Sequence, residues 1–128
     1  MKSYTDIEQS QKLSEILPYK SADMEYMFLK EDSSKVSNIP FIKDDDEPEW
    51  PTDSAYDFIP CWSLAALLDV LPKNLDIGRP VLVTNYRGYY WVSYFDEYMK
   101  EKFTSKIYNN PIDACYELIL KLYELKIL

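Results

Sequence analysis

The segment that most restricts the fold of this chain runs from Lys43 to Pro60, where acidic residues and prolines are too dense for a helix or a strand. Positions 44–57 hold seven acidic residues and no basic residue, and prolines occur at Pro48, Pro51 and Pro60. Proline lacks a backbone donor and fixes φ, so it breaks helices and is confined to sheet edges. We therefore predict an acidic loop at about residues 43–60, and loops of this length tend to be functional or disordered.

The same loop carries almost all of the net charge. The 128 residues include 14 basic and 22 acidic side chains, which give a formal charge of −8. Residues 1–43 contribute −1, residues 44–76 contribute −8 and residues 77–128 contribute +1, which sum to −8. The rest of the chain is nearly neutral. With 47% hydrophobic residues overall, we expect one compact domain spanning residues 1–128.

Three segments have the pattern of helices. Residues 5–17 begin with Thr5 and Glu8 in capping-box register and end before a proline. Residues 61–71 are rich in Leu and Ala and almost uncharged, which is typical of a buried helix. The last helix begins at Pro111 after an asparagine cap, and its apolar residues recur every three or four positions.

Other segments have the pattern of strands. Residues 23–29 are rich in strand formers, and residues 37–42 predict a short strand that a proline would confine to a sheet edge. Residues 81–84 and 89–95 predict a hairpin, because Gly88 can take the left-handed conformation of its turn. Together these elements predict a small α+β domain. We expect an antiparallel sheet, formed by the hairpin and one or two N-terminal strands, to pack with about three helices.

Missing residue types exclude several classes of function. The chain has no histidine, which excludes Ser-His-Asp and Cys-His triads and histidine-containing zinc sites. Its two glycines exclude a Walker A loop and a GxGxxG fingerprint. The pI near 4.5 argues against direct nucleic-acid binding, which depends on Lys and Arg. Because no signal segment or bilayer-spanning apolar stretch is found, we expect a cytoplasmic protein that does not bind a membrane.

Few side chains are candidates for catalysis or metal binding. Cys61 and Cys115 are too far apart for a CxxC pair, and we expect both to be reduced and buried. Cys61 also lacks a histidine base and has apolar neighbours, which raise the pKa of a thiol. Asp69 is the one charged residue in the central helix, and we expect it to lie at the solvent-exposed edge of that helix. The acidic loop lacks the ligand spacing of an EF-hand. We therefore expect no catalytic residue, no metal and no cofactor.

The aromatic strand of the hairpin predicts a surface for a partner protein. Alternation places Trp91 and Phe95 on one face, and Tyr90, Val92 and Tyr94 on the other. We expect the first face to cover the helices. Tyr90 and Tyr94 would then bind the partner, because tyrosine is enriched at protein interfaces. A sheet packed on both faces is the alternative.

The acidic loop is a second candidate for partner binding. It can present phosphate-like charge to a basic nucleic-acid-binding protein, and an aromatic residue among acids is typical of a binding anchor. The residues assigned to this surface are Asp44, Asp45, Asp46, Glu47, Glu49 and Trp50. The alternative is a solvated linker whose acids keep the chain soluble.

Six segments near the two ends and in the central helix carry a family resemblance. They are Tyr4–Ser10, Leu13–Pro18, Ser21–Met24, Pro60–Leu68, Val70–Pro72 and Asn110–Cys115. Together they resemble small acidic proteins that recur in gut-bacterial genomes, often on phage or other mobile elements. The resemblance implies no activity, ligand or site residue. It does imply an accessory protein of a mobile element, a kind of protein that often binds host or phage proteins.

Three hypotheses about function result. The first is a non-catalytic interaction module that binds another protein through the tyrosine face, the acidic loop or both. The second is an acidic mimic of nucleic acid that inhibits a basic DNA- or RNA-binding protein. The third is a small enzyme or ligand-binding protein with an aromatic pocket near Cys61 and Trp62.

Overall fold

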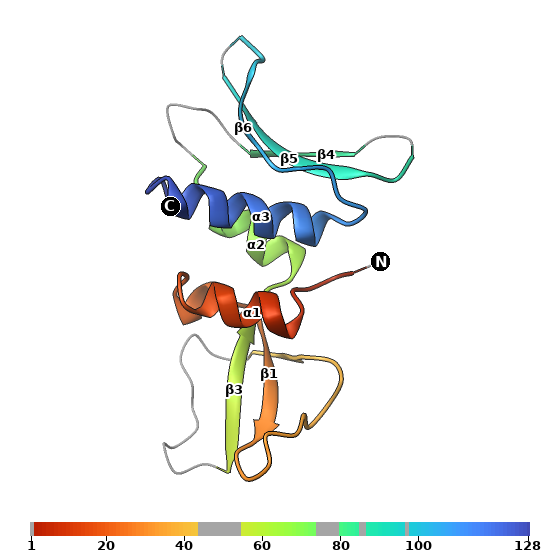
Figure 1. Ribbon diagram of the computed structural model, residues 1–128, viewed down its shortest axis with the longest axis vertical. Coiled ribbons are helices and arrows are strands. Elements are labelled where there is room, and N and C mark those ends of the chain that lie inside the picture. The colour runs from red at the N-terminus through yellow and green to blue at the C-terminus, as the bar shows by residue number, and fades with distance from the viewer. Residues whose placement is uncertain (1, 44–54, 74–79, 85–86, 97) are drawn as a thin grey trace. The chain divides into compact units, whose positions relative to one another are not determined.

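The computed structural model describes residues 2–43, 55–73, 80–84, 87–96 and 98–128 (Figure 1). Within these residues, the chain forms helices and antiparallel strands in the order α1 (Ile7–Ser14), η1 (Tyr19–Ser21), β1 (Met24–Leu29), β2 (Phe41–Ile42), β3 (Tyr56–Cys61), α2 (Leu64–Val70), β4 (Pro80–Thr84), β5 (Tyr90–Phe95), β6 (Glu101–Thr104) and α3 (Pro111–Glu124). The predicted α+β fold class is confirmed.

The chain divides into two compact units. The N-terminal unit is Tyr4–Ala66, and the C-terminal unit combines Met1–Ser3 with Leu67–Leu128. Each unit has its own three-stranded antiparallel sheet, with strand order β2-β1-β3 in the first and β4-β5-β6 in the second. The hairpin and the N-terminal strands, which we expected in one sheet, therefore lie in different sheets. Sequence alternation cannot reveal this, because it identifies strands and not their partners.

Helix α1 of the N-terminal unit begins later than the sequence pattern predicted. Its N-cap is Asp6, which accepts a hydrogen bond from the Gln9 amide, while the Gln9 side chain accepts one from the Asp6 amide. The predicted pair of Thr5 and Glu8 is wrong by one residue. The shift has a physical reason: Thr5 is fully buried and its hydroxyl is used inside the unit, so the exposed Asp6 forms the cap.

Strand β3 corrects the prediction of a loop across residues 43–60. Residues 56–61 pair with the whole of β1, from Leu29 opposite Tyr56 to Met24 opposite Cys61. Pro60 is tolerated because β3 lies at an edge of the β2-β1-β3 sheet, where a missing backbone donor need not break a ladder. Residues 44–54 of the predicted loop lie outside the described residues.

Helix α2 is shorter than the apolar run that predicted it. Cys61 ends strand β3, and the helix begins at Leu64. Ser63 stands at its start, where the Ser63 hydroxyl accepts a hydrogen bond from the Ala66 amide. Asp23 in turn accepts hydrogen bonds from the amide and hydroxyl of Ser63. The hydrogen bonds at the start of α2 therefore depend on Asp23, forty positions earlier in the chain. A local sequence pattern cannot reveal this contact.

The C-terminal unit packs α3 against one side of its sheet (Figure 1). The predicted hairpin is confirmed as β4 and β5, and Gly88 has the expected positive φ of 79°. Strand β6 was not predicted. Helix α3 begins as expected, with the Asn110 side chain accepting a hydrogen bond from the Asp113 amide. Its buried residues are Pro111, Ile112, Ala114, Cys115, Leu118, Ile119 and Leu122.

Candidate functional site

The tyrosine face predicted to bind a partner lies on the buried side of β5. Val92 and Tyr94 are fully buried, whereas Trp91 and Phe95 keep part of their surface accessible. The Tyr94 hydroxyl donates a hydrogen bond of 2.7 Å to the Pro72 carbonyl oxygen, and burial raises the pKa of Tyr94. The expected orientation of the strand is therefore wrong. Alternation groups the residues of each face, but does not decide which face the helix covers.

Tyr90 shares the face of Tyr94 and is half-buried. Its backbone exchanges hydrogen bonds of 2.7 and 2.9 Å with Tyr108, so the residue is fixed by pairing on both sides of its strand. Tyr94 is inaccessible to a partner in this structure, and Tyr90 is accessible only in part. The two tyrosines do not form the exposed pair that the sequence predicted.

The predicted surface on the acidic loop lies outside the described residues. It comprises Asp44, Asp45, Asp46, Glu47, Glu49 and Trp50. Whether these acids form an ordered surface stays a prediction, and so does the hypothesis of a nucleic-acid mimic.

Cys61 belongs to a sealed group of polar side chains in the N-terminal unit. This group, the Thr5 cluster, consists of Thr5, Ser10, Tyr26 and Cys61. The Thr5 and Ser10 hydroxyls lie 2.8 Å apart, and the Thr5 carbonyl accepts hydrogen bonds from the Tyr26 hydroxyl at 2.8 Å and from the Cys61 thiol at 3.3 Å. Cys61 and its neighbour Trp62 have no accessible surface.

The environment of both thiols favours the protonated form. Burial raises the pKa of Cys61, partly offset by hydrogen bonds from its polar neighbours, and burial raises the pKa of Cys115 to about 12. Both cysteines are free and buried, as predicted. Because the thiolate is the nucleophile, neither residue is placed for attack on a substrate. Because Cys61 and Trp62 have no accessible surface, neither side chain lines a pocket open to a ligand, contrary to the third hypothesis.

Asp69 lies at the exposed edge of α2, as the sequence predicted. Its carboxylate pairs with the Lys73 ammonium at 2.6 Å, one helical turn further on. Exposed pairs of this kind contribute little to stability, about 0.2–1 kcal/mol. Asp69 is therefore a surface residue with a lysine partner, and its place in the apolar helix needs no functional explanation.

The described residues contain an exposed apolar segment that sequence reasoning did not identify. The apolar strip, as we name it, consists of Val36, Ile39, Phe41 and Ile42, whose exposed fractions are 44%, 63%, 41% and 78%. The last two form the edge strand β2, where Phe41 pairs with Glu25 and Ile42 with Met24. The sequence does contain a signal for this exposure. Consecutive residues of a strand point to opposite faces, so Phe41 and Ile42 cannot both be buried when only one face of the edge strand is covered.

Lys43 fixes the end of this strip. Its ammonium group lies 3.7 Å from the centre of the Tyr19 ring and donates a hydrogen bond to the Tyr19 carbonyl oxygen at 2.7 Å. Its amide also donates to the Asp23 carbonyl oxygen. These contacts hold Ile42 at the sheet edge with its side chain exposed.

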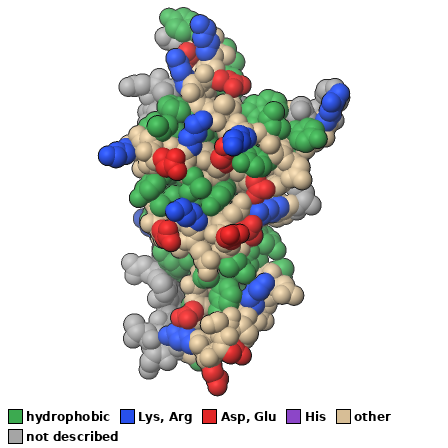
Figure 2. All heavy atoms as spheres, in the orientation of Figure 1, with side chains coloured by type: hydrophobic (Ala, Val, Ile, Leu, Met, Phe, Trp, Pro, Cys, Tyr) green, Lys and Arg blue, Asp and Glu red, His purple; other side chains and the backbone are tan. Residues whose placement is uncertain are grey.

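Charge does not single out a site on the face of the molecule in view. Acidic and basic side chains are interspersed there, with hydrophobic side chains showing between them (Figure 2). No group of three or more Cys, Asp or Glu side chains within the described ranges could hold a metal ion. In the same part of the chain, no helix is both long and apolar enough to cross a bilayer.

Comparisons with protein-family models, with curated proteins and with solved structures gave no match. The function of the chain must therefore be inferred from the geometry and chemistry of its own residues.

Proposed function

We propose that this protein is a non-catalytic interaction module that binds another protein through the apolar strip. The observation that supports this proposal is the exposure of four large apolar side chains within seven consecutive residues. Exposed apolar side chains that lie close together in the chain can mark a binding site, because burying their surface against a partner recovers free energy. An apolar partner surface would recover about 1.5–3 kcal/mol for each large side chain that it buries completely.

The position of the strip also favours a protein partner. Edge strands that expose apolar residues are prone to unspecific pairing, and proteins usually protect them with charges or a covering element. Here Ile39 and Ile42, the most exposed members, lie on either side of Pro40 and Phe41, and Pro40 keeps the strand short. Extended backbone pairing is therefore disfavoured, and side-chain contacts would supply most of the binding energy.

A partner protein also fits the resemblance to accessory proteins of mobile elements, which often bind host or phage proteins. We therefore also propose that the protein is an accessory protein of a mobile element. The partner would present an apolar patch with few charges, since the strip itself contains no ionisable side chain.

The experiment compares two double variants in affinity capture from the source organism, with captured proteins quantified by mass spectrometry. In the first variant, Ile39→Ser and Ile42→Ser make the strip polar. In the control, Tyr98→Ser and Met99→Ser change residues of the C-terminal unit that are equally exposed, at 76% and 77%. We expect the strip variant to lose the partner by at least about tenfold, because two buried isoleucines contribute several kcal/mol. The control variant should retain it.

Two results would contradict the proposal. One is a partner that the strip variant captures as well as the unchanged protein does, with both variants folded by circular dichroism. The other is a strip variant whose only defect is a lower oligomeric mass in light scattering. That result would make a second copy of the chain the occupant of the strip.

A further inference from the structure

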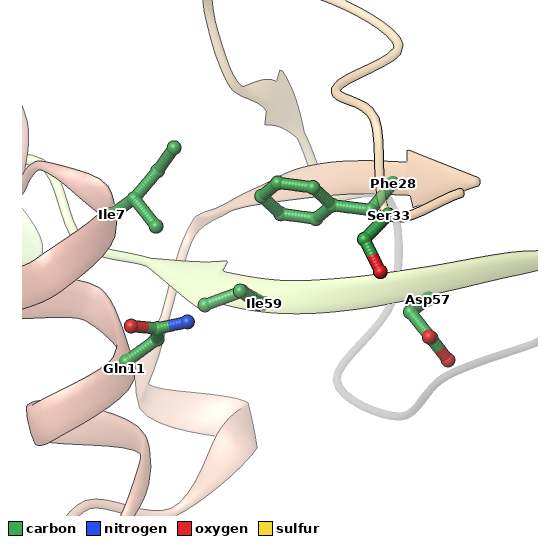
Figure 3. Close-up of a pocket in the computed structure, with 6 residues that line it drawn as sticks. All are labelled: Ile7, Gln11, Phe28, Ser33, Asp57 and Ile59. Atoms are coloured by element: carbon green, nitrogen blue, oxygen red, sulfur yellow. The ribbon is translucent and has the colours of Figure 1, made fainter. Parts of the chain in front are cut away.

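A pocket in the N-terminal unit lies between helix α1 and the β1–β3 pair, and its volume is about 280 Å³ (Figure 3). Two of its residues are one turn apart on α1, three come from β1 and β3, and one follows β1 in a turn. They are Ile7, Gln11, Phe28, Asp57, Ile59 and Ser33. Phe28 and Asp57 are directly opposite one another in the strand pairing, so their side chains leave the same face of the sheet; the Phe28 ring extends toward Ile7, and the Asp57 carboxylate points away from it (Figure 3).

The pocket has a polar end and an apolar middle. Ser33 and Asp57 lie together at one end, Ile7 and Gln11 lie at the other, and Phe28 and Ile59 lie between them (Figure 3). A ligand that fits this order has a polar head, an apolar body and room for a small polar group at its far end. Ligand sites generally combine an apolar lining with a few placed polar groups in this way.

The volume of the pocket fits the body of a small molecule. Pockets for drug-sized ligands span about 300–1,000 Å³, so this one is at the lower end of the range. At about 30 Å³ for each water molecule in the liquid, it corresponds to a ligand of roughly ten non-hydrogen atoms. A nucleotide or a peptide of several residues would extend beyond the pocket into solvent.

Charge determines the chemical class of the head group. Asp57 is the lining residue with a formal charge, and none of the lining residues is basic. The Lys30 ammonium lies 4.0 Å from the Asp57 carboxylate, at the outer limit of an ion pair, and both side chains are largely exposed. Such a pair is weak and leaves the carboxylate able to accept hydrogen bonds from a second cation.

Two further lining groups are available to a ligand. Within the described part of the chain, the Ser33 hydroxyl and the Gln11 amide make no hydrogen bond. Ser33 has a positive φ of 59°, and its backbone amide is held by the Leu29 carbonyl oxygen, so the turn that carries the hydroxyl is fixed. A hydroxyl beside a carboxylate adds a second oxygen acceptor for an ammonium group.

We propose that this pocket binds a small primary amine with an apolar body. The ammonium group donates hydrogen bonds to the Asp57 carboxylate and the Ser33 hydroxyl, and the body lies between Phe28 and Ile59. This site is separate from the apolar strip and does not depend on the proposed protein partner.

The experiment titrates the full chain with three probes that share a phenylethyl body and differ in the charge of their head group: 2-phenylethylamine, 2-phenylethanol and 3-phenylpropanoate. Two-dimensional ¹H–¹⁵N NMR follows the amides of the lining residues. We expect saturable shifts at Ile7, Phe28, Ser33 and Ile59 with the amine, and a dissociation constant about two- to fivefold lower for the amine than for the alcohol, because the Asp57 carboxylate is largely exposed and attracts the ammonium through solvent-screened charge. The carboxylate should not bind.

Two variants test separately whether binding depends on the charge of the pocket and on its volume. Asp57→Asn should weaken binding of the amine about two- to fivefold, to the level of the alcohol. Asp69→Asn is the matched control, since it removes another exposed carboxylate with a lysine partner and should leave binding unchanged. Gln11→Trp fills the pocket from an exposed helical position and should abolish binding of all probes.

Four results would overturn the proposal: no saturable shift with the amine up to about 10 mM, equal affinity for the alcohol or the carboxylate, amine binding that survives Asp57→Asn, or binding that survives Gln11→Trp. The NMR spectrum of each variant shows at the same time whether it is folded. A failure here leaves the partner capture by the apolar strip unaffected, so the two proposals are tested independently.

Discussion

The buried face of α3 in one unit and the Thr5 cluster in the other bury different chemistry, although the C-terminal unit also buries the hydroxyls of Ser93 and Ser105 in its sheet. The C-terminal unit buries an apolar helix face, in which Ile112, Cys115, Leu118, Ile119 and Leu122 of α3 have no accessible surface. The N-terminal unit has a short helix, α1, and buries the hydroxyls of the Thr5 cluster beneath it. The buried face of α3 therefore depends mainly on packing, whereas the Thr5 cluster depends on polar groups that must all be paired.

This difference changes how each unit should respond to mutation. Apolar burial is non-directional and roughly proportional to area, so its loss scales with the volume removed. A buried hydroxyl network depends on geometry, because one lost partner leaves another group unsatisfied at a cost of about 1–3 kcal/mol. Within the described residues, no buried side-chain nitrogen or oxygen is without a hydrogen-bond partner.

The largest effect should come from the packed core of the C-terminal unit. Ile119→Ala removes three methyl or methylene groups from a fully buried position, and we expect a loss of about 2–5 kcal/mol in the free energy of unfolding. Urea denaturation followed by circular dichroism measures it. Tyr123→Ala, at an exposed position of the same helix, is the control and should change stability little. Equal effects of the two changes would show that α3 does not supply the core of this unit.

In the N-terminal unit we expect a smaller change in the free energy of unfolding, and its sign tests whether the Thr5 hydroxyl stabilises the unit. Thr5→Val keeps the shape of the side chain but removes the hydroxyl that accepts a hydrogen bond from the Trp62 amide at 3.1 Å and contacts Ser10 at 2.8 Å. If the side chain had only apolar neighbours, this change would stabilise the protein. Because the hydroxyl has hydrogen-bond partners here, we expect a loss of about 1–3 kcal/mol in the free energy of unfolding. Urea denaturation again measures the change.

The double variant Thr5→Val with Ser10→Ala sharpens this test. It removes both hydroxyls, so the Ser10 oxygen is no longer left without its partner, and the loss should be smaller than the sum of the two single losses. Additive losses, or a stabilising Thr5→Val, would contradict the view that the N-terminal unit depends on paired hydroxyls.

The contrast between the units also explains which features the sequence could predict. The start of α3, its 3–4 spacing and the β4–β5 hairpin depend on neighbouring residues, and all were predicted. The Thr5 cluster joins residues from α1, β1 and β3, and the start of α2 depends on Asp23, so neither is present in any local pattern. Local periodicity likewise failed for Tyr94, because the choice of the buried face depends on where α3 packs.

The pocket and the apolar strip required the same long-range information. Ile7, Phe28 and Asp57 are distant in sequence and are brought together by the pairing of β1 with β3 beneath α1. For the strip, the short strand was predicted but the exposure of Ile42 was not, since exposure depends on what the sheet leaves uncovered. Local patterns therefore located the helices and the hairpin well, missed the strands β3 and β6, and assigned the exposed faces poorly.

The smallest effect compares the two buried thiols, one in each unit. Burial raises the pKa of Cys115 from 9.0 to about 12, so the folded protein keeps its proton at pH values where the unfolded chain has lost it. The contribution of the Cys115 thiol to the free energy of unfolding is therefore complete below pH 9. It is lost as the pH rises toward about 12, by up to about 1.4 kcal/mol per pH unit.

For Cys61 the same burial is partly offset, because hydrogen bonds from Thr5, Ser10 and Tyr26 lower the pKa of its thiol. Urea denaturation between pH 9 and about pH 10 should thus show a flatter pH dependence for Cys115→Ala than for Cys61→Ala. An equal or greater flattening by Cys61→Ala would show that the Thr5 cluster does not stabilise charge, and that the two cores are electrostatically alike.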